Sequence, residues 1–172
     1  CMKSILVSVM WPAWEWIARP DLRYLTASYS EELAIRDAMK TRDIVTSEWY
    51  RANWPHVTIR PDANQKTKYE LHGGGWRLST SVGGRGTGEH PDRKIVDDPH
   101  HVKQAESDVE RQNALTWFDR TLGSRGVSRG ARTVVIMQRL HEKDVSGHIM
   151  SSEDYAAHWD HLCLPMEYER SG

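Results

Sequence analysis

Residues 93–100 read RKIVDDPH, and this stretch decides how the rest of the chain is organised. Ile95 and Val96 form a short apolar run typical of a buried parallel strand, and Pro99 has no backbone N–H to donate to a neighbouring strand. The strand is therefore expected to end at Asp98, with two carboxylates at its carboxyl end. In open α/β sheets ligands bind at that edge, and adjacent acids there suit Mg²⁺. Taken alone, Asp97-Asp98-Pro99 is more typical of an acidic turn that closes the strand.

Composition indicates a globular chain. Its 172 residues are enough for one domain with a sizeable core, and 38% hydrophobic and 27% charged residues argue against a disordered chain. The formal net charge is -1, so any DNA partner must be met by a local patch, another domain or a neighbouring subunit. Two cysteines without a CxxC pattern favour a reducing cytosol, and no segment reaches membrane-spanning length.

Helical and strand patterns alternate along the chain. In chain order, the expected elements are a helix at 5–18, a strand at 22–27, a helix capped by Ser30, a short helix at 47–54, a hairpin of 68–72 and 76–82, a helix at 102–122, a strand at 133–137, a short helix at 145–150 and a strand at 161–164. Strands separated by helices imply an α/β protein with a mainly parallel sheet, helices on both faces and one inserted antiparallel hairpin.

The first helix has an apolar composition and spacing that predict a buried helix. Trp11, Trp14 and Ile17 recur every three residues, which places them on one face. Pro12 must kink the helix or restart it.

Lys3-Ser4 ahead of this helix matches the end of the phosphate-binding pattern GxxxxGK[ST]. Met2 stands where the last glycine belongs, so the dipeptide alone is more typical of a surface Lys-Ser at a helix start. Its order along the chain is more informative. A Lys-Ser helix start followed later by an apolar strand ending in Asp97-Asp98 reproduces the arrangement of a P-loop ATPase. Asp97 would then hold Mg²⁺ through water, and Asp98 would orient or activate the attacking water.

Two further segments carry candidate phosphate contacts. Residues 83–88 hold four glycines around Arg85, but Glu89 stands where a GxGxxG pattern needs its third glycine. The loop is either a flexible connection or a mobile element that presents Arg85 to a phosphate, in cis or in trans. Gln138 and Arg139 follow the strand at 133–137. They would sense the γ-phosphate, or they form an ordinary polar strand end.

Several segments resemble the ATPase domain of tailed-phage terminase large subunits. They are TASYS (26–30), LAIRD (33–37), SEWY (47–50), TSVGGRGTG (80–88), IVDDPH (95–100), VIMQRLHE (135–142) and, at the end of the same domain, LCLPM (162–166). The likeness covers nearly the whole chain. It implies a P-loop NTPase fold of the RecA/ASCE type over residues 1–172, truncated at the N-terminus within the phosphate loop and lacking the separate C-terminal nuclease domain.

The resemblance also implies roles for four residues at the site. Lys3 and Ser4 look like the pair that binds the phosphates of ATP, and Ser4 and Asp97 look like the residues that hold Mg²⁺. Asp98 takes the place of the catalytic carboxylate, for which the family commonly uses glutamate.

The remaining candidates would respond to the γ-phosphate. Gln138 matches the coupling segment of the family, and Arg85 or Arg139 would supply an arginine finger. Arg85 is preferred because the surrounding glycines allow its loop to move towards a neighbour.

The implied function is an ATP-driven motor that packages viral DNA. Such domains form a homo-oligomeric ring on the portal protein, act with a terminase small subunit on double-stranded DNA, and work in the cytoplasm of an infected or lysogenic bacterium, transiently on the procapsid portal and not in a membrane. Two alternatives stay open. One is another P-loop DNA translocase or helicase, and the other is an inactive prophage remnant or assembly module that folds without hydrolysing ATP.

Overall fold

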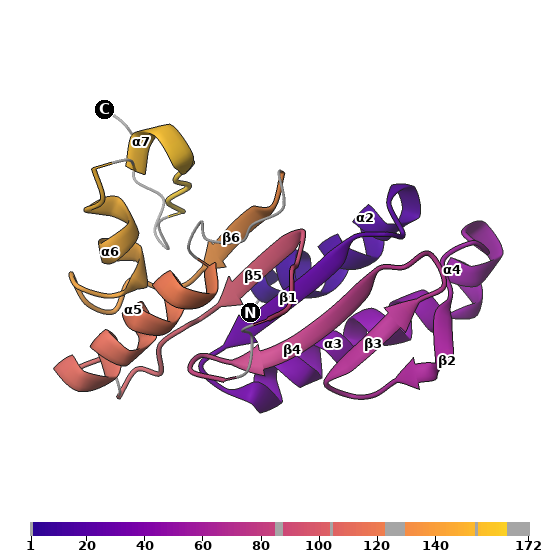
Figure 1. Ribbon diagram of the computed structural model, residues 1–172, viewed down its shortest axis with the longest axis horizontal. Helices are drawn as coiled ribbons and strands as arrows, with labels where there is room; N and C mark the ends of the chain where they lie inside the picture. Colours follow the sequence, from indigo (N-terminus) through magenta and orange to yellow (C-terminus); the bar gives the residue numbers. More distant parts are fainter. Residues whose placement is uncertain (1, 85–87, 104, 123–129, 154, 165–172) are drawn as a thin grey trace.

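A six-stranded sheet forms the centre of the protein (Figure 1). The computed structural model describes residues 2–84, 88–103, 105–122, 130–153 and 155–164. The strand order is β2-β3-β4-β1-β5-β6. The strands are β1 (Arg23–Ser28), β2 (Ile59–Asn64), β3 (Lys68–Leu71), β4 (Trp76–Ser81), β5 (Arg93–Asp97) and β6 (Arg132–Ile136). β4, β1, β5 and β6 pair in parallel, whereas β2 and β3 extend the sheet in antiparallel pairings. The predicted α/β class and the β3–β4 hairpin are confirmed.

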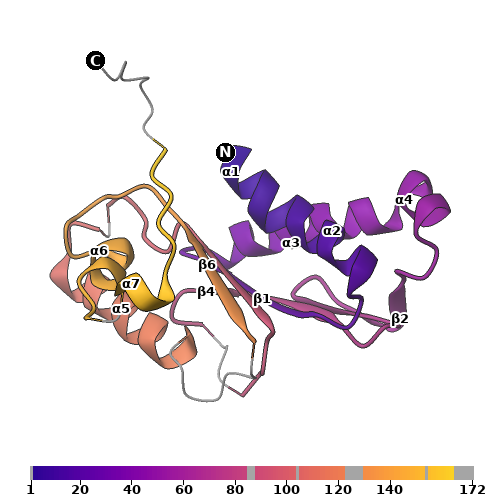
Figure 2. The ribbon, with the colours of Figure 1, turned by 90° about the horizontal axis from the view of Figure 1, so that it is seen from above.

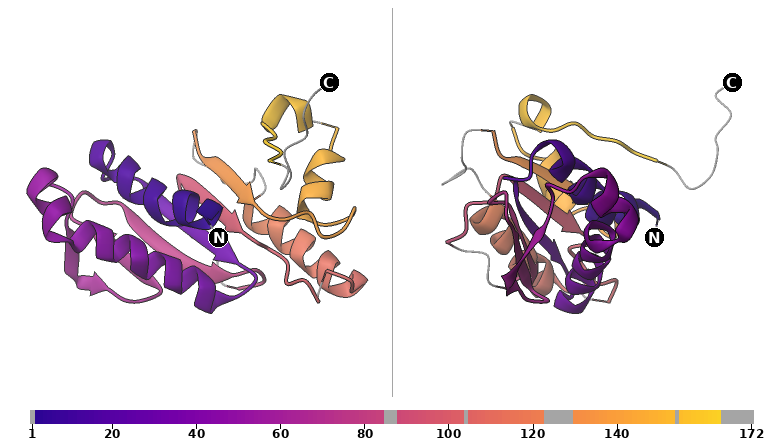
Figure 3. Two further views of the ribbon diagram at one scale, coloured as in Figure 1. Left: turned by 180° about the vertical axis from the view of Figure 1, so that it is seen from behind. Right: turned by 90° about the vertical axis from the view of Figure 1, so that its right-hand side faces the viewer.

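Helices cover both faces of the sheet (Figure 2). They are α1 (Met2–Ser4), η1 (Ile5–Met10), α2 (Trp11–Ala18), α3 (Glu31–Thr46), α4 (Glu48–Asn53), α5 (Asp108–Leu122), α6 (Val145–Met150) and α7 (Tyr155–His158). The α1–η1–α2 run and α3 lie side by side on one face (Figure 3), and α5 and α6 lie on the other. No helix among the described residues is long and apolar enough to cross a membrane.

Each central strand contributes to two separate cores. Tyr24 and Ile95 belong to the cluster under α2 and α3, whereas Leu25 and Val96 belong to the cluster under α5 and α6. Successive strand residues point to opposite faces, so an apolar run is needed where both faces are covered. This is why the short runs of β1 and β5 could be recognised as central strands.

The N-terminal helical run contains a π-helical segment, η1, immediately before Pro12. The Trp11 amide donates to the carbonyl of Leu6, an i→i+5 bond, and α2 begins with Pro12 in its first turn. In a regular α-helix the ring of Pro12 would clash with the carbonyl of Ser8 and leave that carbonyl without its donor. The wider turn relieves this conflict, so the run continues past Pro12 instead of ending there.

The helix that was predicted to be buried faces solvent on one side, although Ile17 packs against the core. Trp14 is 68% exposed and Trp11 is 40% exposed, whereas Ala13 and Trp16 lie in the core and Trp16 is fully buried. Apolar residues occur on more than one side of the helix, so three-residue spacing did not select the side that faces the sheet. The wider turn of η1 also rotates the residues of α2 relative to those before it, which changes which of them face the sheet.

Three element predictions need correction. The helix expected at 102–122 begins at Asp108, because Ser107 caps it by accepting a hydrogen bond from the Glu110 amide at 3.4 Å. Residues 161–164 are exposed and form no strand. Strand β2 escaped prediction because its Pro61-Asp62 centre breaks the apolar alternation that identifies a strand.

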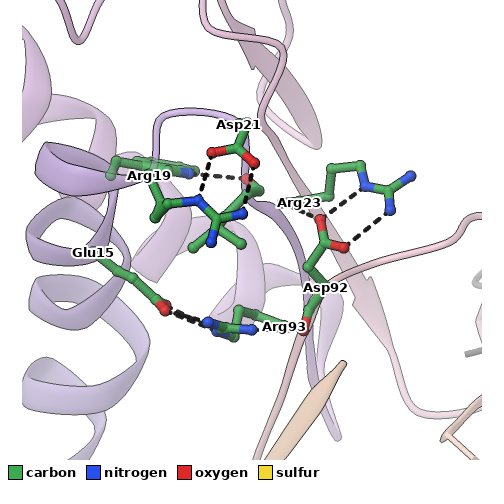
Figure 4. A network of polar contacts seen from close by, with 8 residues as sticks. Glu15, Arg19, Asp21, Arg23, Asp92 and Arg93 are labelled. Atoms are coloured by element: carbon green, nitrogen blue, oxygen red, sulfur yellow. Dashed lines mark hydrogen bonds and ion pairs between the residues drawn. The ribbon is translucent and has the colours of Figure 1, made fainter. Parts of the chain in front are cut away.

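An ion-pair network fixes α2 to the amino ends of β1 and β5 (Figure 4). Arg93 Nε donates to Glu15 at 2.9 Å, Tyr24 also donates to Glu15, and Arg23 Nε donates to Asp92 at 2.8 Å. Desolvation alone would raise the pKa of Glu15, but the hydrogen bonds from Arg93 and Tyr24 outweigh it and hold the pKa below its usual value. The network lies at the opposite end of these strands from Asp97.

Candidate functional site

Asp97 at the end of β5 is bonded to two serines of the N-terminal helical run. Ser4 Oγ donates to Asp97 Oδ1 at 3.1 Å, and Ser8 Oγ donates to Asp97 Oδ2 at 2.8 Å. The partners are 93 and 89 positions apart in the chain. Ser4 and Asp97, which sequence patterns had selected separately, therefore lie in direct contact.

Burial sets the charge properties of Asp97. Desolvation raises the pKa of this carboxyl above its ordinary value; the two serine hydroxyls oppose the shift, and the neighbouring charge of Asp98 adds to it. Keeping a buried carboxylate ionised without a partner costs free energy. A cation bound beside it would therefore stabilise its ionised form. Carboxylate and hydroxyl oxygens are also the ligand types that Mg²⁺ prefers.

Asp98 adopts a backbone conformation that is rare for residues other than glycine. Its φ is 46°, and the strand ends at Asp97, one residue earlier than predicted. The Asp98 amide donates to the carbonyl of Ile136 at 2.8 Å, and its own carbonyl accepts from the Tyr29 amide at 3.1 Å. Bonds to the neighbouring chain segments on both sides therefore hold this left-handed residue at the sheet edge.

Lys3 lies beside Asp98. The distance from Lys3 Nζ to Asp98 Oδ1 is 3.7 Å, and both side chains are partly exposed. The predicted basic and acidic residues thus meet at the carboxyl end of β5, where a ligand could replace the carboxylate as the partner of the ammonium group.

Gln138 and Arg139, the candidates after β6, point to different surroundings. A pocket, here called the Gln138 pocket, is lined by Tyr29, Asp98, His100, His101, Val102, Met137, Gln138 and Leu140. Arg139 instead contacts the carbonyl of Glu142 at 3.5 Å and the sulfur of Met150 at 3.9 Å. The fold therefore brings Gln138, but not the Arg139 guanidinium, to Asp98. Arg85 lies outside the described residues.

A second hollow also has Asp98 in its lining. This Asp97 cavity is lined by Ser4, Ser8, Thr26, Ala27, Ser28, Leu33, Ala34, Arg36, Asp37, Arg77, Asp97 and Asp98. Sequence patterns did not identify Ser8, Asp37 or Arg77. A signal existed for Ser8, which follows Ser4 by four positions and so shares its helix face. Nothing local distinguishes Arg77, because its burial arises only when α3 packs on β4.

His100 is a buried histidine next to the site, and it gives the protein a pH dependence. Its Nε2 accepts a hydrogen bond from the Val145 amide at 3.1 Å. Burial lowers the pKa of His100; Asp144 opposes this shift and Arg111 adds to it. Below about pH 6.5 the unfolded chain therefore binds a proton at His100 that the folded chain does not bind.

We expect the free energy of unfolding to be unaffected by His100 above about pH 6.5 and to fall as the pH drops below that value, with a slope of up to about 1.4 kcal/mol per pH unit. Urea unfolding between pH 5 and 8 measures this, and His100→Gln should flatten the slope. The exposed His161 offers a matched control as His161→Gln. Equal slopes in wild type and His100→Gln would contradict the assignment.

Comparisons with known proteins add no assignment: no protein-family model matches the chain, and no curated protein does. The fold and site define an α/β protein with an acid pair at the carboxyl end of a central parallel strand. A lysine and two serines from a neighbouring helical run face that pair. The donor set of Ser4, Asp97 and Lys3 fits a magnesium-bound phosphate chemically, because it combines oxygen ligands with an ammonium group.

Proposed function

We propose that this protein is a P-loop ATPase domain. The observation that carries the proposal is the hydrogen bond from Ser4 to Asp97, with Lys3 beside Asp98. Two motifs recognised independently, one near the N-terminus and one after residue 90, meet at the strand edge where nucleotides bind in open α/β sheets. A surface Lys-Ser and an unrelated acidic turn would have no reason to meet there.

Each residue of the site has a separate role in the proposed reaction. Lys3 would leave Asp98 and bind the β- and γ-phosphates, while Ser4 would provide an oxygen ligand for the metal ion and Asp97 would hold that ion through water. When bound, Mg²⁺ neutralises charge on the phosphate oxygens. Asp98 orients the attacking water and accepts its proton, and Gln138 contacts the γ-phosphate region from the other side of Asp98. Burial among Ser4, Ser8 and the sheet keeps bulk water away from Asp97.

The more specific proposal is the ATPase domain of a terminase large subunit. Its support is the set of segments resembling that family, which includes the residues at both the Asp97 cavity and the Gln138 pocket. In this role ATP hydrolysis drives double-stranded DNA into a procapsid through a portal protein. A helicase or another translocase would share the ATP site. Binding to a portal protein would identify a terminase, whereas separation of DNA strands would identify a helicase.

Calorimetry with ATP and Mg²⁺ on the full-length protein tests the ATP site. We expect Lys3→Ala to weaken binding at least about tenfold, since the ammonium group contacts two phosphates. The exposed Lys66, on the turn between β2 and β3, provides a charge-matched control as Lys66→Ala. Failure of the wild type to bind ATP would overturn the proposal and favour an assembly module or inactive remnant.

A further inference from the structure

Thr41 lies beneath the π-helical turn that carries Ser8. It is fully buried on α3, and its hydroxyl contacts the carbonyl of Val9 at 3.0 Å and that of Asp37 at 3.2 Å. The Asp37 bond is the ordinary contact of a helical threonine with the preceding turn. The Val9 bond is different, because it joins α3 to the backbone of a separate helical segment.

The fully buried Arg77 on β4 holds the Thr41 hydroxyl from below. Its Nη1 donates to Thr41 Oγ1 at 2.5 Å. Since the guanidinium donates to the oxygen, the single hydroxyl proton is left free to point at the backbone carbonyls. Burial makes this arrangement rigid, because a charged group excluded from water cannot give up its acceptor cheaply.

Ser8 lies within the π-helical turn that precedes Pro12. Pro12 excludes the regular α-helical turn, and the resulting i→i+5 bonding shifts the residues around Ser8 relative to an α-helix. Val9, the residue fixed by Thr41, follows Ser8 directly. A contact with the Val9 carbonyl therefore restrains the backbone of the turn from which the Ser8 hydroxyl reaches Asp97 Oδ2 at 2.8 Å.

We propose that Thr41, held by Arg77, is a positioning residue that aims Ser8 at Asp97 through the π-helical turn. The relay runs Arg77, Thr41, Val9 backbone, Ser8, Asp97, and it joins β4, α3, η1 and β5. It deepens the ATPase proposal, on which it rests for the role of Asp97 as a metal ligand. The geometric part of the proposal concerns only the Ser8–Asp97 bond. It can be tested independently of the ATPase proposal.

The carboxyl carbon resonance of Asp97 in isotope-labelled protein, at fixed pH above 7, tests the geometric part. Thr41→Val keeps the shape but removes the hydroxyl, and it should shift this resonance in the same direction as Ser8→Ala. Thr41→Ser retains the hydroxyl and should restore the wild-type position. Thr46→Val is the matched control, because Thr46 also bonds the preceding turn of α3 but is exposed. It should change nothing.

Mn²⁺ alone serves as the probe for the metal part. Partners that orient a metal ligand typically change affinity 10- to 100-fold, so Thr41→Val should weaken Mn²⁺ binding on the order of tenfold and Thr41→Ser should restore it.

A folded Thr41→Val protein with an unshifted Asp97 resonance would overturn the relay. If Thr41→Val fails to fold, Pro12→Ala, which permits an α-helical turn, must shift the resonance or the relay is wrong. Absence of Mn²⁺ binding in the wild type would count against the ATPase proposal, while the resonance would still report on the relay.

Discussion

Replacing Asp98 by asparagine is expected to reduce ATP hydrolysis by the full-length protein at least about 100-fold. Asparagine is the most suitable replacement, because it tolerates the left-handed conformation that Asp98 adopts at a φ of 46°. It preserves the size of the side chain but cannot accept a proton. Steady-state ATPase assays with and without DNA measure the effect.

The same variant separates hydrolysis from binding. Asp98 is the partner of Lys3 at 3.7 Å, so asparagine frees the lysine for phosphate. We therefore expect kcat to fall while ATP affinity is kept or strengthened. Asp43→Asn removes the same charge from an exposed position in the last turn of α3 and should leave turnover unchanged. Unchanged turnover in Asp98→Asn would remove Asp98 from the proposed mechanism.

Replacing Trp16 by alanine is expected to lower the free energy of unfolding by about 3 to 5 kcal/mol. Trp16 is fully buried, its ring meets those of Tyr24 and Tyr69 edge to face at 5.4 and 6.2 Å, and its Nε1 donates to the Leu22 carbonyl at 2.9 Å. Alanine would leave a cavity under α2 and an unpaired carbonyl. Thermal or urea unfolding measures the loss, which corresponds to a melting temperature roughly 6 to 20 °C lower.

Trp14 provides the control for this measurement. It lies two positions earlier on the same helical run but is 68% exposed, so Trp14→Ala should change the free energy of unfolding by less than about 0.5 kcal/mol. Comparable losses in the two variants would contradict the buried face assigned to α2. The pair therefore tests which side of α2 faces the core.

Prediction from sequence succeeded where the chain provides a local physical constraint. The β5 strand could be recognised because Ile95 and Val96 must each be buried on a different face. The β3–β4 hairpin could be recognised because Gly74, with a φ of 89°, allows the turn. Prediction failed where apolar residues appear on several sides, as in α2, or where an edge strand tolerates polar residues, as in β2.

For the candidate site, the sequence by itself determined the residue types and their order: a lysine and serine before a helix, two acids at the end of a strand, and a glutamine after the next strand. Only the tertiary structure decided that Ser8 completes the contacts of Asp97, that Gln138 lines a pocket together with Asp98, and that the buried Arg77 bonds to Thr41. The physical reason is that strand order and helix packing bring together residues up to 93 positions apart, and no local pattern specifies those distances.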